Sequence, residues 1–170
     1  MDNIRLIEEK IESSPEGRDQ YCFFADPAAH SLSPLMYNTA FDDLGIDAEY
    51  SAFRVAKGEI GMAMDLVRRL SIKGCNISMP HKQEVMEHLD EVDGFAGLCN
   101  AVNTVVNVQG SGKLIGYNTD ASGAATAVKE MGSPIKGENI VLLGLGGAGQ
   151  AVLCGLASHG PKKISVFLRS

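Results

Sequence analysis

The chain has 170 residues, of which 45% are hydrophobic and 21% charged, a composition that suits a globular protein and excludes a disordered one. Residues 1–118 hold 10 basic and 18 acidic side chains, an excess of negative charge that argues against a nucleic-acid partner. Residues 119–170 hold 5 basic and 3 acidic side chains, and this mildly basic segment suits a phosphate-bearing ligand.

The cysteines and the N-terminus argue against two further classes. Cys22, Cys75, Cys99 and Cys154 are widely spaced, without a CxxC pair or a histidine cluster, so neither a metal site nor a disulfide framework is predicted. The first residues, MDNIRLIEEK, lack the apolar core of a secretory signal, and no apolar run approaches the length of a membrane span. We therefore expect a cytoplasmic protein without a membrane partner.

Short β-branched or aromatic runs alternate with stretches of helical period, which is typical of an α/β fold with a mostly parallel sheet. Helices are predicted over 3–12, 33–45, 57–70 and 81–88, and strands over 21–25, 48–55, 74–78, 102–108 and 114–118. Gln109-Gly110-Ser111-Gly112 suits a hairpin turn between the last two strands, which would close a first domain over 1–118.

The helix over 33–45 should begin at Ser33 and Pro34, because serine can cap free amides and the fixed φ of proline suits a first turn. Its inward face is expected to consist of Leu35, Thr39, Phe41 and Leu44.

Residues 119–170 predict the start of a second domain: a helix over 120–131, then a β-α-β unit over 140–143, 148–159 and 164–168. A nucleotide-binding Rossmann sheet normally holds about six strands, so we interpret this segment as a linker helix and the first unit of an incomplete Rossmann domain. Part of its apolar surface should be uncovered, and these 170 residues alone should have little activity.

The glycine motif inside this unit predicts a dinucleotide-binding turn, because a strand precedes it and a helix follows. Gly144 allows the tight turn, and Gly146 and Gly147 let the backbone approach a pyrophosphate. Ala148 begins a helix whose free amides suit that negative charge, and Gly149 allows close helix–strand packing. The alternative is a turn that binds nothing.

The end of the last strand bears on the choice of cofactor. In NAD enzymes an acidic residue about 20 positions after the glycine motif binds the ribose 2′-hydroxyl, whereas arginine there suits the 2′-phosphate of NADP. Arg169 occupies this place. The cofactor is therefore predicted to be NADP or NAD, and Arg169 favours NADP.

Several polar positions outside the glycine motif could carry chemistry. Lys82 follows an apolar strand and a proline turn, where partial desolvation would make its amine a tunable acid or base; a surface lysine is the alternative. Asp120 either caps the following helix, serves a site, or does both. Asn103 lies in an apolar strand, so it must bond to backbone or face a polar ligand. Ser31 and Ser33 suit a carboxylate at a helix start, with plain capping as the alternative.

Together these motifs resemble those of shikimate dehydrogenases in order and spacing. The matching segments are residues 26–34 (DPAAHSLSP), 76–82 (NISMPHK), 101–104 (AVNT) and 118–120 (NTD), with the glycine motif. The resemblance extends from residue 21 to residue 170. Ala25, Ala28, Ala121 and Leu168 depart from the family pattern, but the catalytic positions are intact.

The resemblance implies a substrate-binding domain over 1–118 and the NADP- or NAD-dependent reduction of 3-dehydroshikimate to shikimate. It implies that Lys82 and Asp120 form the catalytic pair, that Ser31 and Ser33 bind the substrate carboxylate, and that Ser78 and Asn103 bind ring hydroxyls.

Three points stay open at this stage. The Ser-Met-Pro run and Tyr117 are similar to the quinate/shikimate branch, so quinate is an alternative substrate. A homodimer is an open option. The competing hypotheses are a catalytically silent shikimate-binding module and a dehydrogenase that acts on another carboxylated ring or on a folate.

Overall fold

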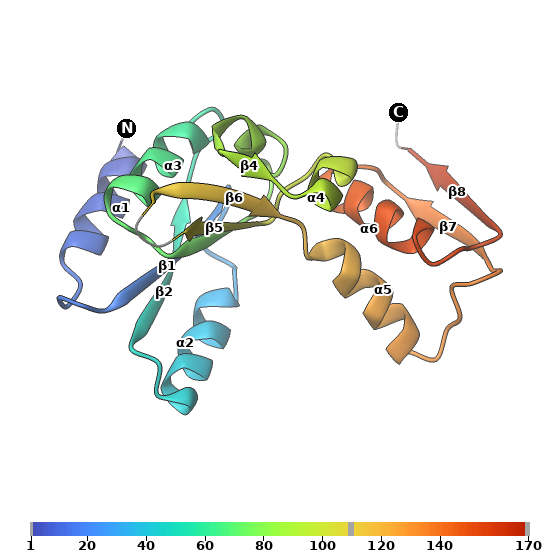
Figure 1. The fold of residues 1–170 in the computed structure, drawn as a ribbon, viewed down its shortest axis with the longest axis horizontal. Coiled ribbons are helices and arrows are strands. Elements are labelled where there is room, and N and C mark those ends of the chain that lie inside the picture. Colours follow the sequence, from blue (N-terminus) through green and yellow to red (C-terminus); the bar gives the residue numbers. More distant parts are fainter. Residues whose placement is uncertain (1, 109–110, 169–170) are drawn as a thin grey trace.

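A computed structural model describes residues 2–108 and 111–168, and Figure 1 shows two lobes joined near the start of α5. The turn predicted at Gln109 and Gly110 and the predicted cofactor-binding residue Arg169 lie outside the described residues. In the first lobe, the described strands form a six-stranded sheet of order β2-β1-β3-β5-β6-β4. The α/β prediction is confirmed.

The first three strands are parallel, β5 is antiparallel to β3, and β6 is antiparallel to β5. The short β4 pairs in parallel with β6. The strands are β1 (Asp19–Ala25), β2 (Ala48–Arg54), β3 (Gly74–Ile77), β4 (Glu91–Val92), β5 (Thr104–Val108) and β6 (Lys113–Tyr117). Because β5 runs against its neighbours, its first residues lie at the edge where β1, β3 and β6 end.

One face of this sheet forms the main core. Cys22 and Phe24 alternate along β1 and are fully buried, as the two-residue period of a strand requires. They pack with apolar side chains of α1 (Asp2–Glu12) and α3 (Ile60–Arg69), which cover this face. The opposite face carries Tyr21 and Tyr50, which are in register, and it is covered by α2 (Ser33–Leu44).

The expected inward face of α2 was largely wrong. Leu35 and Leu44 are 70% and 72% exposed, Thr39 is also exposed, and only Phe41 of the expected set packs inward. The reason lies on β2, an edge strand with unpaired backbone groups. Asn38 bonds to both the N–H and the C=O of Tyr50, at 2.8 and 2.9 Å, and this contact directs the neighbouring Tyr37 and Phe41 toward the sheet.

Two further expectations needed correction. The segment expected as a helix over 81–88 is a 3₁₀ helix over Glu84–His88, and α3 begins at Ile60, three residues later than expected. The short α4 (Gly94–Cys99) was not predicted, because two glycines in six residues disfavour a helix. It forms since Asp93 accepts the Phe95 N–H at 2.9 Å and tertiary packing buries Ala96 and Cys99.

The second lobe contains α5 (Asp120–Glu130), β7 (Asn139–Leu143), α6 (Gly147–Ala157) and β8 (Lys163–Phe167). Its two strands are parallel, and α6 packs closely against α5, as Figure 1 shows. Val141, Leu143 and Phe167 are exposed on the sheet, as expected for an uncovered apolar surface.

Asp90, which lies beside the β5–β6 hairpin of the first lobe, should make the free energy of unfolding depend on pH. A bond from the Leu114 backbone N–H and a second from Arg68 hold the pKa of the Asp90 carboxyl below its ordinary value. A carboxyl whose pKa is lower in the folded than in the unfolded chain raises the free energy of unfolding at pH values above the unfolded-state pKa, about 3.9. This contribution is lost as the pH falls through the folded-state pKa.

Asp90→Asn is therefore expected to lower the urea midpoint at pH 7, and this difference from the wild type should shrink below about pH 3. The matched control is Asp43→Asn, since Asp43 is exposed on α2. A difference for Asp90→Asn that is constant with pH would contradict the assignment.

Candidate active site

The polar residues expected to carry chemistry meet at one edge of the six-stranded sheet. Ser78 and Lys82 follow the end of β3, Asn103 directly precedes β5, and Asp120 follows the end of β6. The pairing of Asn76 with Thr104, and of Thr104 with Tyr117, brings these ends into register. In a sheet of this kind, residues at the carboxyl ends of parallel strands commonly line the ligand crevice.

Lys82 and Asp120 are in direct contact although 38 positions separate them. Lys82 Nζ donates to Asp120 Oδ2 at 2.5 Å, and the side chains are only 14% and 28% exposed. Lys82 is therefore not the solvated surface residue of the alternative interpretation. Capping by Asp120 is also wrong: Thr119 is the N-cap of α5, and Asn118 Oδ1 accepts the Ala121 N–H at 3.3 Å.

Asn103 holds the second oxygen of the same carboxylate. Its Nδ2 donates to Asp120 Oδ1 at 2.7 Å and to Thr119 Oγ1 at 2.9 Å, while its Oδ1 accepts the Thr119 N–H at 3.0 Å. Because a buried amide must satisfy both its ends, these bonds fix its orientation. Asp120 is thus bonded at one oxygen by an amide and at the other by an ammonium group.

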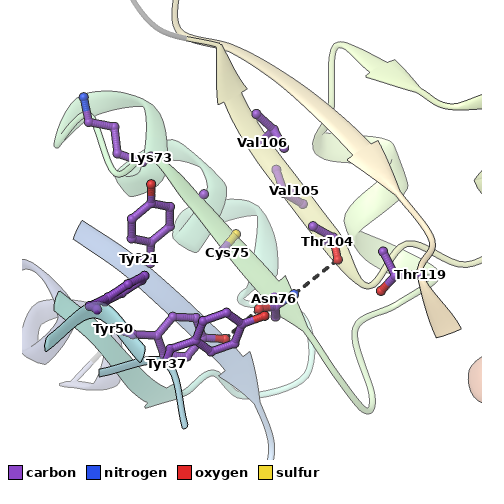
Figure 2. Close-up of a pocket in the computed structure, with 12 residues that line it drawn as sticks. Tyr21, Tyr37, Tyr50, Lys73, Cys75, Asn76, Thr104, Val105, Val106 and Thr119 are labelled. Atoms are coloured by element: carbon purple, nitrogen blue, oxygen red, sulfur yellow. Dashed lines mark hydrogen bonds between the residues drawn. The ribbon is translucent and has the colours of Figure 1, made fainter. Parts of the chain in front are cut away.

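A second asparagine in this cluster, Asn76, was missed by the sequence reasoning. It belongs to the pocket in Figure 2, about 520 Å³ in volume, which has aromatic side chains on one side and Thr104 and Thr119 on the other. Asn76 Nδ2 donates to Asn103 O at 3.3 Å and to Thr104 Oγ1 at 3.2 Å. The signal was present, since Asn76 is a polar residue inside an apolar strand, as Asn103 was taken to be.

The serines expected to bind substrate lie in three different surroundings. Ser78 shares a pocket with Lys82 and the glycine motif. Ser31 lines a different pocket, beside β2, and its Oγ accepts the Ser33 N–H at 3.2 Å. Ser31 rather than Ser33 therefore provides the side-chain contact at the start of α2. Burial raises the pKa of Tyr50 well above its ordinary value, and a hydrogen bond with Ser33 partly offsets this rise.

The glycine motif faces Lys82 across a pocket of about 500 Å³ lined by Ser78, Lys82 and the first turn of α6. Gly144 has a φ of +92°, which favours glycine, and a Cβ on Gly149 would lie 2.6 Å from Gly144 O. A Cβ on Gly147 would lie 3.4 Å from the Lys82 Cβ, so the turn and the lysine are neighbours. The free amides expected at the start of α6 and the glycines at positions 144, 146 and 147 fit a pyrophosphate.

Two charge-related features flank the cluster. An ion pair with Arg54, in which Nε lies 2.7 Å from Oδ1, lowers the pKa of Asp26 and ties the loop before Ser31 to the end of β2. Burial raises the pKa of Cys99 to about 12, and a hydrogen bond with Cys154 and the charge of Asp120 add to this. Cys99 is therefore a neutral, packed thiol at ordinary pH.

Among the described residues, no group of three or more histidine, cysteine, aspartate or glutamate side chains could hold a metal ion. Within the same part of the chain, none of the helices is long and apolar enough to span a membrane.

Comparison with known proteins shows which proteins this chain is similar to. Residues 23–105 match the family described as shikimate dehydrogenase substrate binding domain. A shikimate dehydrogenase (NADP(+)) of Streptococcus uberis is 47% identical over 143 residues, which are 84% of this chain and 48% of that protein. The chain belongs to the shikimate dehydrogenase family.

Solved structures of the shikimate dehydrogenase family agree with this membership. The Listeria monocytogenes enzyme in complex with shikimate and NAD has a TM-score of 0.84 and 39% identity, over 93% of this chain and 54% of that one. The Thermus thermophilus enzyme in complex with NADP(H) and shikimate has a TM-score of 0.81 and 38% identity, over 89% and 56%. The chain thus spans about half the length of the relatives it matches.

Proposed function

We propose that the protein carrying this sequence is an NADP-dependent shikimate dehydrogenase, with NAD as the alternative cofactor, that interconverts 3-dehydroshikimate and shikimate. The observation that carries the proposal is the Lys82–Asp120 contact, because Lys82 also lines a pocket together with the glycine turn. An enzyme that reduces a ketone needs a proton donor near the reacting oxygen and a cofactor site beside it. Family membership supports the same reaction.

In this proposal the first part of the chain, over 1–118, binds the substrate. Ser31 and Ser33 bind the carboxylate at the start of α2, where backbone amides and the helix dipole favour negative charge. Ser78 and Asn103, beside Lys82 and Asp120, bind ring hydroxyls of the substrate. Relatives solved with shikimate bound support a small carboxylated substrate, and quinate is the alternative substrate.

Lys82 acts as the proton donor in the reductive direction. Its ammonium group protonates the substrate oxygen as negative charge develops there, and in the reverse direction the amine takes that proton back. Asp120 orients the ammonium group and offsets the cost of its partial burial, while Asn103 keeps the carboxylate in place. A bound nicotinamide supplies or accepts the hydride.

The cofactor part is proposed to begin at residue 119, with Gly144, Gly146, Gly147, Ala148 and Gly149 against the pyrophosphate. NADP is favoured because the similar curated enzymes are named for it, although one relative was solved with NAD. We further propose that the protein acts in the cytoplasm, without a membrane or nucleic-acid partner, with a homodimer as one option.

The test is shikimate-dependent reduction of NADP⁺ by the protein that carries this sequence, followed by absorbance at the nicotinamide band, with NAD⁺ and quinate in parallel. Titration calorimetry with shikimate, with and without NADP⁺, accompanies the assay. Turnover supports the proposal. Shikimate binding without turnover or cofactor coupling would favour a silent binding module, and neither binding nor turnover would refute both.

The glycine turn gives a second prediction. Gly149→Ala places a methyl group 2.6 Å from Gly144 O, which must displace backbone. We expect the dissociation constant of NADP⁺ to rise on the order of tenfold, which corresponds to about 1.4 kcal/mol. Gly97→Ala on α4 is the control, because nothing lies within 4 Å of that position. Equal NADP⁺ affinity in both variants, measured by calorimetry, would exclude this turn as the phosphate site.

A further inference from the structure

Tyr50 is a buried phenol placed between the start of α2 and the cluster around Asp120. It is 3% exposed, and its hydroxyl donates to Asn76 Oδ1 at 2.7 Å. Its ring stacks on Tyr37 with centroids 4.4 Å apart and planes inclined by 12°. Its backbone N–H and C=O are both bonded to Asn38. The ring and the backbone of Tyr50 are therefore held independently of its hydroxyl.

The Tyr50 hydroxyl fixes which way the Asn76 amide faces. Because the hydroxyl donates to Oδ1, the NH₂ group of Asn76 must point the other way, toward Thr104 Oγ1 and the backbone carbonyl of Asn103. Figure 2 shows Asn76 in this place, with the stacked tyrosines on one side and Thr104 on the other. A backbone carbonyl can only accept, so the orientation is determined at both ends of the amide.

The series of oriented hydrogen bonds continues from Asn76 to Asp120. Thr104 Oγ1 accepts from Asn76, and its own proton is donated to Asn103 Oδ1 at 2.9 Å. With Oδ1 occupied by this bond and by the Thr119 N–H, the NH₂ group of Asn103 faces Asp120 Oδ1, and Asp120 Oδ2 faces Lys82 Nζ. Each donor thus sets the orientation of the next group, and such directional chains are more ordered than isolated bonds.

We propose that Tyr50 is a positioning residue for the Lys82–Asp120 pair: its hydroxyl orients Asn76 and, through Thr104 and Asn103, fixes the Asp120 carboxylate. The effect on turnover rests on the proposed dehydrogenase function, whereas the effect on Asn103 does not. Without the hydroxyl, Asn76 Oδ1 loses the donor that Tyr50 supplied, and the amide is held only through its bonds to the Asn103 carbonyl and Thr104 Oγ1. The amide then moves more freely, which loosens the bond from Thr104 to Asn103.

The test compares Tyr50→Phe with Tyr21→Phe. Both tyrosines line the same pocket, but Tyr21 pairs with Phe41 and lies near Lys73, away from the chain of bonds. Tyr50→Phe is expected to lower kcat about tenfold and to change KM less than about twofold, because a small displacement of a catalytic group reduces the rate more than binding. Tyr21→Phe should leave both constants near those of the wild type.

A double-mutant cycle with Thr104→Val separates positioning from general destabilisation. If Tyr50 acts through Thr104, the double variant should lose little more in kcat than Tyr50→Phe alone, whereas independent effects on stability would multiply. Unchanged kcat in Tyr50→Phe, or losses that multiply in the cycle, would overturn the proposal.

A second readout needs no turnover. In the 170-residue chain, hydrogen exchange of the Asn103 side-chain amide, followed by NMR, is expected to accelerate at least about fivefold in Tyr50→Phe and to stay unchanged in Tyr21→Phe. If the wild type proves inactive, the dehydrogenase proposal fails and this measurement alone decides the role of Tyr50. Equal exchange in both variants would then refute it.

Discussion

Replacement of Lys82 by alanine is expected to lower kcat/KM for shikimate oxidation by on the order of 10²–10⁴-fold, the usual contribution of a positioned general acid or base. Lys82 Nζ is the ammonium group on Asp120 Oδ2, and the aliphatic part of the Lys82 side chain lies beside Gly147 of the glycine turn. The KM for shikimate should change much less than kcat, because the carboxylate is proposed to bind at Ser31 and Ser33.

Asp120→Asn should also lower kcat strongly, because the neutral amide keeps the shape of the carboxylate but no longer offsets the desolvation of Lys82. Lys57→Ala is the matched control, since Lys57 is exposed ahead of α3. Initial rates over a range of shikimate concentrations, with the melting temperature of each variant, provide the measurement. Wild-type rates in either Lys82→Ala or Asp120→Asn would rule out the proposed mechanism.

The sequence predicted much of the fold because local patterns and packing agree there. Residues Gly74–Ile77 are an apolar run closed by a proline turn, and the structure makes them a strand that ends beside Lys82. The glycine motif connects β7 to α6 and extends into the first turn of that helix, as its spacing required. Spacing alone could not predict that Lys82 and Asp120 would meet, because β5 and β6 lie between them; the family resemblance carried that expectation.

What the sequence did not reveal depends on contacts between distant segments. The orientation of α2 is set by Asn38 on the backbone of β2, and no apolar period within the helix encodes that contact. Asn76 and Tyr50 acquire their places only when β1, β2 and β3 pair in register. Ser31 and Ser33 suited a carboxylate, with plain capping as the alternative, and the sequence could not show that Ser31 and Ser78 would line different pockets.

The close approach of α5 and α6 gives the other large effect. A Cβ on Gly155 would lie 2.3 Å from the backbone oxygen of Ala121, so Gly155→Ala must push the two helices apart. Ala121 and Ala151 are fully buried at this contact, which leaves little room for adjustment. We expect a loss of about 3 kcal/mol in the free energy of unfolding, at the upper end of the usual cost of overpacking.

For a chain of this length, each kcal/mol corresponds to a fall of roughly 2–4 °C in melting temperature. Gly123→Ala on α5 is the matched control, because that position is exposed with nothing within 4 Å. Here alanine should raise stability by about 0.5–1 kcal/mol, since it narrows the unfolded ensemble and favours helix. Thermal and urea unfolding of both variants should give effects of opposite sign.

Because Ala121 directly follows Asp120, the helix shift in Gly155→Ala should also displace the carboxylate that holds Lys82. A Gly155→Ala variant as stable as the wild type would show that the two helices can separate without cost, and Asp120 would then need another explanation for its fixed position.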